Sequence, residues 1–299
     1  MKGIVIKSYG DTFKIKVSDS IYRCKIRGKH RLKNNFSNPI VSGDFVDIIL
    51  SGEKGYGIIE KIYERKNYFI KKSKKENKGH LIGSNIDQVI IIFSIKNPYT
   101  KLVFLDKCLS ASKYYKIKPI ILFNKIDLLD TNEKERLDII NNEYKKLGFF
   151  CISVSAKFNI GMDKLKLKLK NKQSLILGNS GVGKSTIINR ISSFSNQKTD
   201  SLSSKTGRGK QTTTFSEMFK IDNSTTIIDT PGFKDFNFFQ IEKNDIKYLY
   251  PEFEKKFNNC KFSNCTHTNE PNCSIKDSIG NDIWERRYKN YLLIVSEFD

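Results

Sequence analysis

The segment GNSGVGKST at residues 178–186 most constrains how this chain can fold. It fits the phosphate-binding pattern G-x-x-x-x-G-K-[ST] and lies between the apolar run SLILG and the helical pattern KSTIINRI, the context that this pattern requires. The backbone N–H groups of such a loop wrap phosphates at a helix N-terminus. We therefore expect Lys184 to reach the β- and γ-phosphate oxygens and Ser185 to bind Mg²⁺.

Apolar periodicity divides the 299 residues into segments of different character. Residues 1–70 contain five short strand-like runs between turn residues, which predicts an OB-type β-barrel that binds RNA. From residue 86, continuous apolar runs alternate with helical patterns, which predicts a doubly wound α/β domain. The predicted boundaries are a barrel at 1–70, a charged linker at 71–85, the α/β domain at 86–245 and a C-terminal domain at 246–299.

The tetrad NKID at residues 124–127 follows the apolar run PIILF and favours guanine over adenine. Asp127 can accept hydrogen bonds from the guanine N1–H and N2 amine, a donor pattern that adenine lacks. Asn124 is expected to brace neighbouring loops, and the stem of Lys125 to lie along the base. In SAK, residues 155–157, the Ala156 N–H can meet guanine O6, although so short a motif is weak alone.

Two motifs after the phosphate loop match the GTPase segments that contact Mg²⁺ and the γ-phosphate. In DTPG, Asp229 is expected to hold Mg²⁺ through water, and the Gly232 N–H to contact the γ-phosphate. In the run TTT at 212–214, a threonine assigned as Thr213 would complete the Mg²⁺ shell, with ordinary solvation as the alternative. The predicted nucleotide-binding residues are Asn124, Lys125, Ile126, Asp127, Ser155, Ala156, Lys157, Gly178, Asn179, Ser180, Gly181, Val182, Gly183, Lys184, Ser185, Thr186, Asp229 and Gly232.

These motifs occur in an unusual order, because the two that read the base precede the one that binds phosphate. An ordinary GTPase order, cut before the NKID half and rejoined in front of the phosphate loop, gives this arrangement. The site would survive such a cut, since the loops after parallel strands converge at one edge of the sheet. The sequence therefore predicts a circularly permuted P-loop GTPase domain.

The segment CKFSNCTHTNEPNC holds three of the six cysteines and one of the three histidines. Cys260, Cys265, His267 and Cys273 offer three thiolates and one imidazole, a set that suits a closed tetrahedral Zn²⁺ site. A disulfide is the alternative, and a reducing cytoplasm disfavours it. We therefore expect one structural zinc in the C-terminal domain.

Charge and hydropathy indicate the cellular setting. No apolar run approaches the ~20 residues of a membrane span, and the strand-like N-terminus lacks the features of a signal peptide. We therefore expect a cytoplasmic, monomeric protein without membrane contact. The net charge of +21 favours a polyanionic partner, although a codon bias toward lysine is an alternative, since only nine of the 53 basic residues are arginine.

The combined motifs cover almost the whole chain. The predicted barrel, SNIDQVIIIFS, NKID, SAK, GNSGVGKST, GRGKQTTT, DTPGF, CKFSNCTHTNEPNC and RRYKNYLLI together resemble the RsgA/YjeQ family of circularly permuted GTPases, which act late in maturation of the small ribosomal subunit. The resemblance implies GTP hydrolysis stimulated by that 30S subunit, contacts with its rRNA, and one Zn²⁺ per chain.

We assign Lys184, Gln211 and Thr213 as the catalytic set, with Gln211 as the nearest candidate to orient the attacking water. This chain departs from the family at Gln211, where a histidine is usual, and Phe233 follows DTPG where many regulatory GTPases place a water-orienting glutamine. Two other functions stay open at this point. One is GTPase action on the large subunit, which the barrel and cysteine cluster disfavour. The other is an RNA-binding module without turnover, which the intact Lys184, Ser185 and Asp229 disfavour.

Overall fold

The computed structural model describes residues 1–26, 36–52, 55–73, 77–196, 216–232 and 236–299. Five strands at the N-terminus form a closed barrel, because β1 pairs with both β2 and β4, and β3 and β5 complete the circuit. Val5, Ile15 and Ile59 are fully buried at its centre. The strands are β1 (Lys2–Tyr9), β2 (Thr12–Val17), β3 (Ser20–Ile26), β4 (Phe45–Leu50) and β5 (Tyr56–Ile62).

A mainly parallel sheet forms the centre of the molecule, in the order β10-β9-β8-β11-β13, with β12 antiparallel at its edge. All six residues of β8 are buried, which explains why its sequence shows no alternation. β12 continues the sheet into the barrel through the pairing of Lys7 with Glu217. The strands are β8 (Gln88–Phe93), β9 (Lys118–Phe123), β10 (Phe150–Ser153), β11 (Gln173–Gly178), β12 (Glu217–Lys220) and β13 (Thr226–Asp229).

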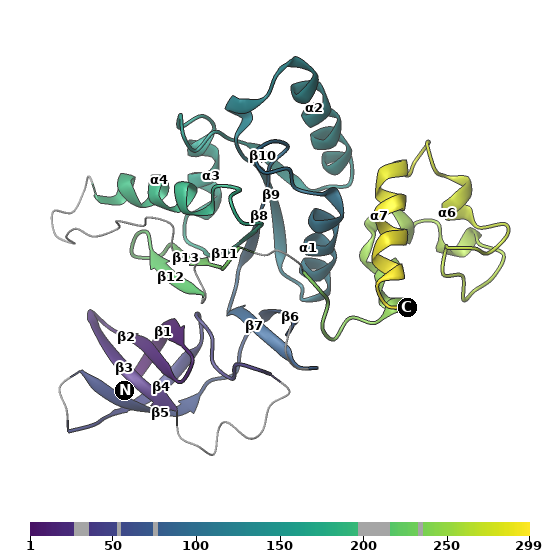
Figure 1. The fold of residues 1–299 in the computed structure, drawn as a ribbon. Coiled ribbons are helices and arrows are strands. Elements are labelled where there is room, and N and C mark those ends of the chain that lie inside the picture. The colour runs from purple at the N-terminus through teal and green to yellow at the C-terminus, as the bar shows by residue number, and fades with distance from the viewer. Residues whose placement is uncertain (27–35, 53–54, 74–76, 197–215, 233–235) are drawn as a thin grey trace.

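Helices cover both faces of this sheet, as the doubly wound prediction requires (Figure 1). One apolar cluster joins one face of the sheet to α1 and α2, and a second joins the other face to α3 and α4. Asp130 caps α2 in a capping box with Glu133, and Leu147 is the C-cap of that helix. The helices are α1 (Leu102–Tyr114), η2 (Ile126–Leu128), α2 (Thr131–Lys146), α3 (Met162–Leu169) and α4 (Lys184–Asn196).

The segment expected to be a linker at 71–85 is instead mostly a β-hairpin. β6 (Tyr68–Lys72) pairs with β7 (Gly79–Ser84), and Phe69, Ile70 and Leu81 are buried. The hairpin packs on the chain after DTPG, where the Lys72 N–H donates to Asn237 O at 3.0 Å. The lysine-rich run KKSKKENKG led to the prediction of a linker. The hairpin forms because the apolar residues that anchor it lie on either side of that run.

The C-terminal module is mainly helical and packs against α1 on the side of the domain away from α4 (Figure 1). Its elements are η3 (Lys243–Leu249), α5 (Pro251–Glu254), η4 (Phe257–Asn259), α6 (Ser274–Asp277) and α7 (Glu285–Ser296). The boundary expected after residue 245 therefore falls inside η3. No helix in the described ranges is both long enough and apolar enough to cross a membrane.

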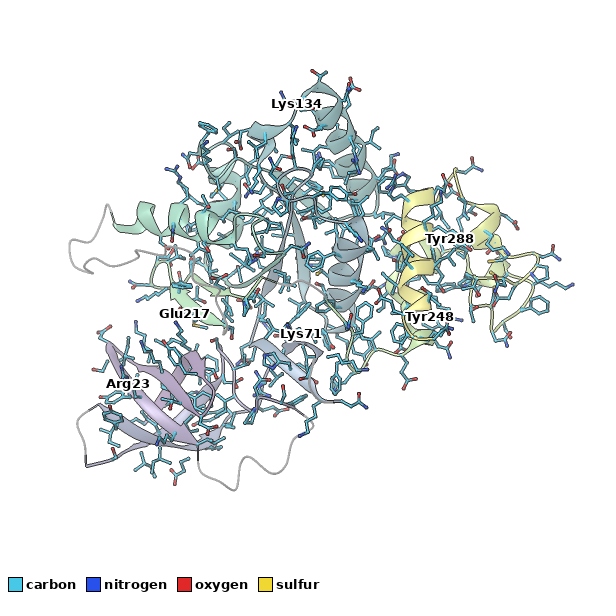
Figure 2. The ribbon with its side chains drawn as sticks, in the orientation of Figure 1. Arg23, Lys71, Lys134, Glu217, Tyr248 and Tyr288 are labelled. Carbon is cyan, nitrogen blue, oxygen red and sulfur yellow. The ribbon has the colours of Figure 1, made fainter. Side chains whose placement is uncertain are left out.

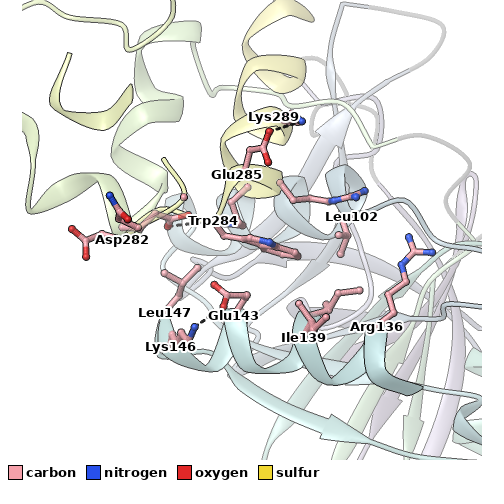
Figure 3. Close-up of a pocket in the computed structure, with 16 residues that line it drawn as sticks. Leu102, Arg136, Ile139, Glu143, Lys146, Leu147, Asp282, Trp284, Glu285 and Lys289 are labelled. Atoms are coloured by element: carbon pink, nitrogen blue, oxygen red, sulfur yellow. Dashed lines mark hydrogen bonds and ion pairs between the residues drawn. The ribbon is translucent and has the colours of Figure 1, made fainter. Parts of the chain in front are cut away.

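A buried ionic network holds this module to the central domain. The Arg287 guanidinium of α7 forms ion pairs with Asp106 of α1 and with Glu252 at 2.8 Å, and Asn290 donates to Asp106 at 2.6 Å. A cavity of about 870 Å³ lies beside this contact, where Trp284 extends toward Ile139 and Glu143 of α2 (Figure 3).

Candidate nucleotide site and metal cluster

The phosphate loop connects the end of β11 at Gly178 to the start of α4 at Lys184. The Lys184 ammonium donates to the carbonyl oxygens of Gly178 at 2.7 Å and Asn179 at 2.8 Å, so the side chain lies along the loop that carries it. Burial lowers the pKa of Lys184 to about 8, although the charge of Asp229 opposes the shift. Ser185 and Thr186 are exposed on the first turn of α4.

Two glycines of this loop have positive φ, Gly181 at +80° and Gly183 at +98°. A Cβ on Gly183 would lie 2.4 Å from Asn124 Nδ2, so a side chain there would displace the NKID loop. A Cβ on Gly181 would meet only Pro98, at 3.4 Å. Gly183 therefore serves close packing as well as backbone conformation.

Asn124 connects the NKID loop to the phosphate loop and the SAK loop, as expected from the sequence. Its amide Nδ2 donates to Val182 O of the phosphate loop at 2.8 Å, and its Oδ1 accepts from the Ala156 N–H at 3.3 Å. The second bond differs from expectation, because the Ala156 N–H points to Asn124 instead of being free for guanine O6. Asn124 is 5% exposed, so water competes little for either bond.

The other residues predicted to contact the guanine base lie in the same loops as Asn124 or next to them. Lys125 has a left-handed φ of 65° and donates through Nζ to Asn97 O, and its Cε lies 4.0 Å from the Cβ position of Gly183. Asp127 lies half-buried in η2. Arg190 of α4 donates to the carbonyl oxygens of Ala156 at 3.2 Å and Lys157 at 2.8 Å. The helix after the phosphate loop thus also positions the SAK loop.

The DTPG loop packs directly on the phosphate loop. Asp229 ends β13 and is 2% exposed, and Thr230 Oγ1 donates to Ile176 O at 2.7 Å. A Cβ on Gly232 would lie 2.8 Å from Ser180 Cα, so Gly232 approaches the phosphate loop more closely than another residue could. Gln211, Thr213 and Phe233 lie outside the described residues.

Sheet topology explains how motifs in this order reach one place. β8, β9, β10, β11 and β13 are all parallel, so their carboxyl ends lie at the same edge. NKID follows β9, SAK follows β10, the phosphate loop follows β11 and DTPG ends β13. Sequence reasoning missed Arg190 and the loop at Asn97 and Pro98, because neither belongs to a contiguous motif.

The predicted metal ligands come together in the C-terminal module. The ligand atoms of Cys260, Cys265, His267 and Cys273 lie within 4.8 Å of one another. His267 Nδ1 faces the thiols, 3.6 Å from Cys260 Sγ and 3.4 Å from Cys273 Sγ. None of the chain's six cysteines, all in described segments, forms a disulfide.

The surroundings of His267 suit a metal ligand. Burial lowers its pKa to about 4, which keeps the imidazole in the neutral form that binds metals. Its ring stacks on Phe257 with centroids 5.4 Å apart, and Tyr288 Oη donates to its carbonyl oxygen at 2.9 Å. Three sulfur donors and one nitrogen fit a tetrahedral structural Zn²⁺.

Comparisons with known proteins agree with this geometry. The RsgA GTPase family model matches residues 62–239, and the RsgA N-terminal domain model matches residues 2–59. "Small ribosomal subunit biogenesis GTPase RsgA 2" of Bacteroides thetaiotaomicron is 40% identical, with 99% of this chain and 97% of the relative covered. The relative named "Small ribosomal subunit biogenesis GTPase RsgA" from Christiangramia forsetii is also 40% identical, with 99% and 96% covered.

Two solved structures share the fold over nearly the whole chain. YjeQ from Thermotoga maritima is 31% identical, with a TM-score of 0.76 and 99% of this chain and 98% of that one covered. YloQ, described as a circularly permuted GTPase, is 25% identical, with a TM-score of 0.69 and 99% and 94% covered. The permuted strand order, the convergent loops and these relatives lead to one conclusion: the chain belongs to the RsgA GTPase family.

Proposed function

We propose that this protein hydrolyses GTP to GDP and phosphate and assists late maturation of the small ribosomal subunit, with the subunit stimulating hydrolysis. One observation carries the hydrolase assignment: Asn124 links the NKID, SAK and phosphate loops, while Gly232 packs on Ser180. The loops expected to recognise the base, bind the phosphates and contact the γ-phosphate thus meet at one sheet edge, which supports the proposal. The ribosomal partner is supported by the printed names of the relatives.

Each predicted residue of the nucleotide site has a role that follows from its side-chain chemistry. Asp127 would read guanine through its carboxylate, and Lys184 would neutralise charge on the β- and γ-phosphates. Mg²⁺, which stabilises charge on the phosphates, would be held by Ser185, by Asp229 through water, and by Thr213. Gln211 would orient the attacking water, because its amide can accept from water and donate to a phosphate oxygen. The remaining nucleotide contacts belong to the loops named above.

The other parts of the chain would serve docking. The barrel and the C-terminal module would contact rRNA, with Cys260, Cys265, His267 and Cys273 holding one Zn²⁺ that stabilises the module. We further propose a monomer acting in the cytoplasm, where immature subunits occur. The barrel's lysines and exposed tyrosines suit a polyanion with unpaired bases.

The test is GTP hydrolysis by the wild type and Gln211→Ala, each alone and with separated small or large subunits. We expect strong stimulation by small subunits only, and loss of most of it in Gln211→Ala with GTP affinity unchanged. Stimulation by large subunits alone would favour the large-subunit alternative. GTP binding with no turnover under any condition would favour a structural nucleotide pocket. A fully active Gln211→Ala would leave the water to be placed by the loop backbone or by rRNA.

A further inference from the structure

Two aromatic side chains lie at the surface of the C-terminal module, away from the nucleotide loops. Tyr248 is 54% exposed and Phe262 is 40% exposed, although rings of this size are usually buried. Each ring carries a neighbouring cation: Lys247 Nζ lies 5.1 Å from the Tyr248 centroid, and Lys261 Nζ lies 5.6 Å from the Phe262 centroid. Tyr248 and the barrel's Arg23 lie on opposite sides of the molecule (Figure 2).

Both rings line a cavity of about 500 Å³, within the usual range of small-ligand sites. Asn258 and Ser263 add polar groups to its lining, which also includes three of the four predicted metal ligands. None of the lining residues, all of which the structure describes, is acidic. The lining residues are Lys247, Tyr248, Phe257, Asn258, Cys260, Lys261, Phe262, Ser263, Cys265 and His267.

The cavity is held by contacts that do not depend on a ligand. Tyr248 packs edge-to-face on Phe257 with centroids 5.3 Å apart, and Phe257 stacks in turn on His267. Lys247 Nζ donates to Cys265 O at 2.9 Å, which fixes that cation beside the ring. A preformed site spends less conformational entropy when a ligand binds.

The positive character of this cavity is local. Residues 246–299 contain eight basic and eight acidic residues, so the chain's overall lysine excess does not explain it. Glu270, an acidic residue of the same loop region, accepts hydrogen bonds from the backbone N–H groups of Thr266 and Thr268 at 2.6 and 3.0 Å. Its charge is therefore partly satisfied within the loop.

The cavity beside α2 shows the contrast (Figure 3). There Glu143 pairs with Lys146 at 2.6 Å, and Glu285 pairs with Lys289 at 2.7 Å, so charges of both signs line the wall and neutralise one another. The charges that line that cavity therefore do not indicate which kind of ligand would bind there. The cavity at Tyr248 combines open aromatic rings with lysines and no carboxylate.

We infer that the Tyr248–Phe262 cavity binds an unpaired nucleotide of single-stranded RNA, with the base stacked on an aromatic ring and a phosphate beside Lys261. Aromatic rings accept any base on their faces, and lysines follow the backbone, which is the common chemistry of single-strand recognition. Asn258 provides a donor and an acceptor for a base edge. This inference deepens the proposed function, since it rests on an RNA-containing partner and names where one strand docks.

The test uses the full-length, zinc-loaded protein and a fluorescent, unstructured 12-nucleotide RNA, with a duplex of the same sequence as comparison. Loss of one stacked base weakens binding roughly 5- to 150-fold, so Tyr248→Ala and Phe262→Ala should each lose affinity in that range. Tyr248→Phe should stay within about twofold, because the ring is kept. Leu293→Ala, which removes an apolar side chain that is 55% exposed on α7, is the matched control and should bind normally.

Metal content and GTP affinity of each variant report folding separately from RNA binding. If Tyr248→Ala loses zinc, Lys261→Glu replaces it: this exposed side chain follows Cys260 but supplies no ligand atom, so zinc content should hold while repulsion weakens RNA binding. Wild-type affinity for the RNA in Tyr248→Ala, Phe262→Ala and Lys261→Glu would overturn the inference. Normal RNA affinity with lost small-subunit binding would assign the cavity to a ribosomal protein and also overturn it. Absence of subunit-stimulated hydrolysis in the wild type would instead contradict the proposed function, whatever the RNA result.

Discussion

The nucleotide site and the metal cluster are assembled in opposite ways. The nucleotide site draws on loops from residue 124 to residue 232, which meet because five parallel strands end at one edge. The metal cluster lies within residues 260–273, and its shape depends on local turns packed against Tyr288 and Tyr291. A permutation of the chain preserves the first kind of site, because topology fixes it, whereas a local substitution can abolish the second.

The largest expected effect is on the metal cluster. Cys265→Ser removes a buried thiolate, and structural Zn²⁺ contributes about 10–16 kcal/mol in zinc-finger peptides, so we expect zinc loss and increased hydrogen exchange across residues 257–278. GTP affinity should change little, because the phosphate loop lies in a different apolar cluster. Metal analysis with exchange measurements checks this. Zinc retained in a Cys260/Cys265/Cys273 triple variant would refute the ligand assignment.

The junction between the two regions comes next. Arg287→Met leaves Asp106 and Glu252 buried without their cation, which costs about 3–5 kcal/mol for such pairs. We expect a lower free energy of unfolding and a C-terminal module that is cleaved more readily by protease. Lys289→Met, which breaks an exposed pair with Glu285, should change stability by less than about 1 kcal/mol. Equal losses in both variants would show that the network does not hold the module.

A smaller effect is expected inside the nucleotide site. Gly183→Ala brings a Cβ to 2.4 Å from Asn124 Nδ2, so the NKID loop must move. Gly181→Ala has a similar backbone strain but only ordinary contact with Pro98, and it is the matched control. Strain at such positions costs about 1–3 kcal/mol, so both variants lose some stability. GTP affinity should be about tenfold lower in Gly183→Ala than in Gly181→Ala, because only the first variant displaces Asn124. Equal affinities would mean that the brace does not shape the site.

Much of this architecture could be predicted because the residues that determine it lie in short contiguous segments of the sequence. The barrel strands, the α2 capping box and the NKID, SAK, phosphate and DTPG loops each carry a local signal, and the structure forms these elements where those signals occur. The hairpin at Phe69 and Leu81 was missed because a lysine run interrupts its pattern. The pairing of Arg287 with Asp106 spans 181 residues, and no single-sequence pattern reports it. The hydrogen bond from the Ala156 N–H to Asn124 Oδ1 joins two loops 32 residues apart, and neither motif alone reports it.

If the permuted loops form one guanine site, Asp127→Asn should change which base that site prefers. The measurement is the affinity of wild type and variant for GTP, XTP and ATP. We predict that the wild type prefers GTP, and that the variant loses GTP affinity by roughly 5- to 150-fold, since an unmatched buried polar edge costs about 1–3 kcal/mol, while gaining XTP. Equal affinity of the wild type for GTP and ATP, or an unchanged preference in Asp127→Asn, would show that these loops do not form a guanine site.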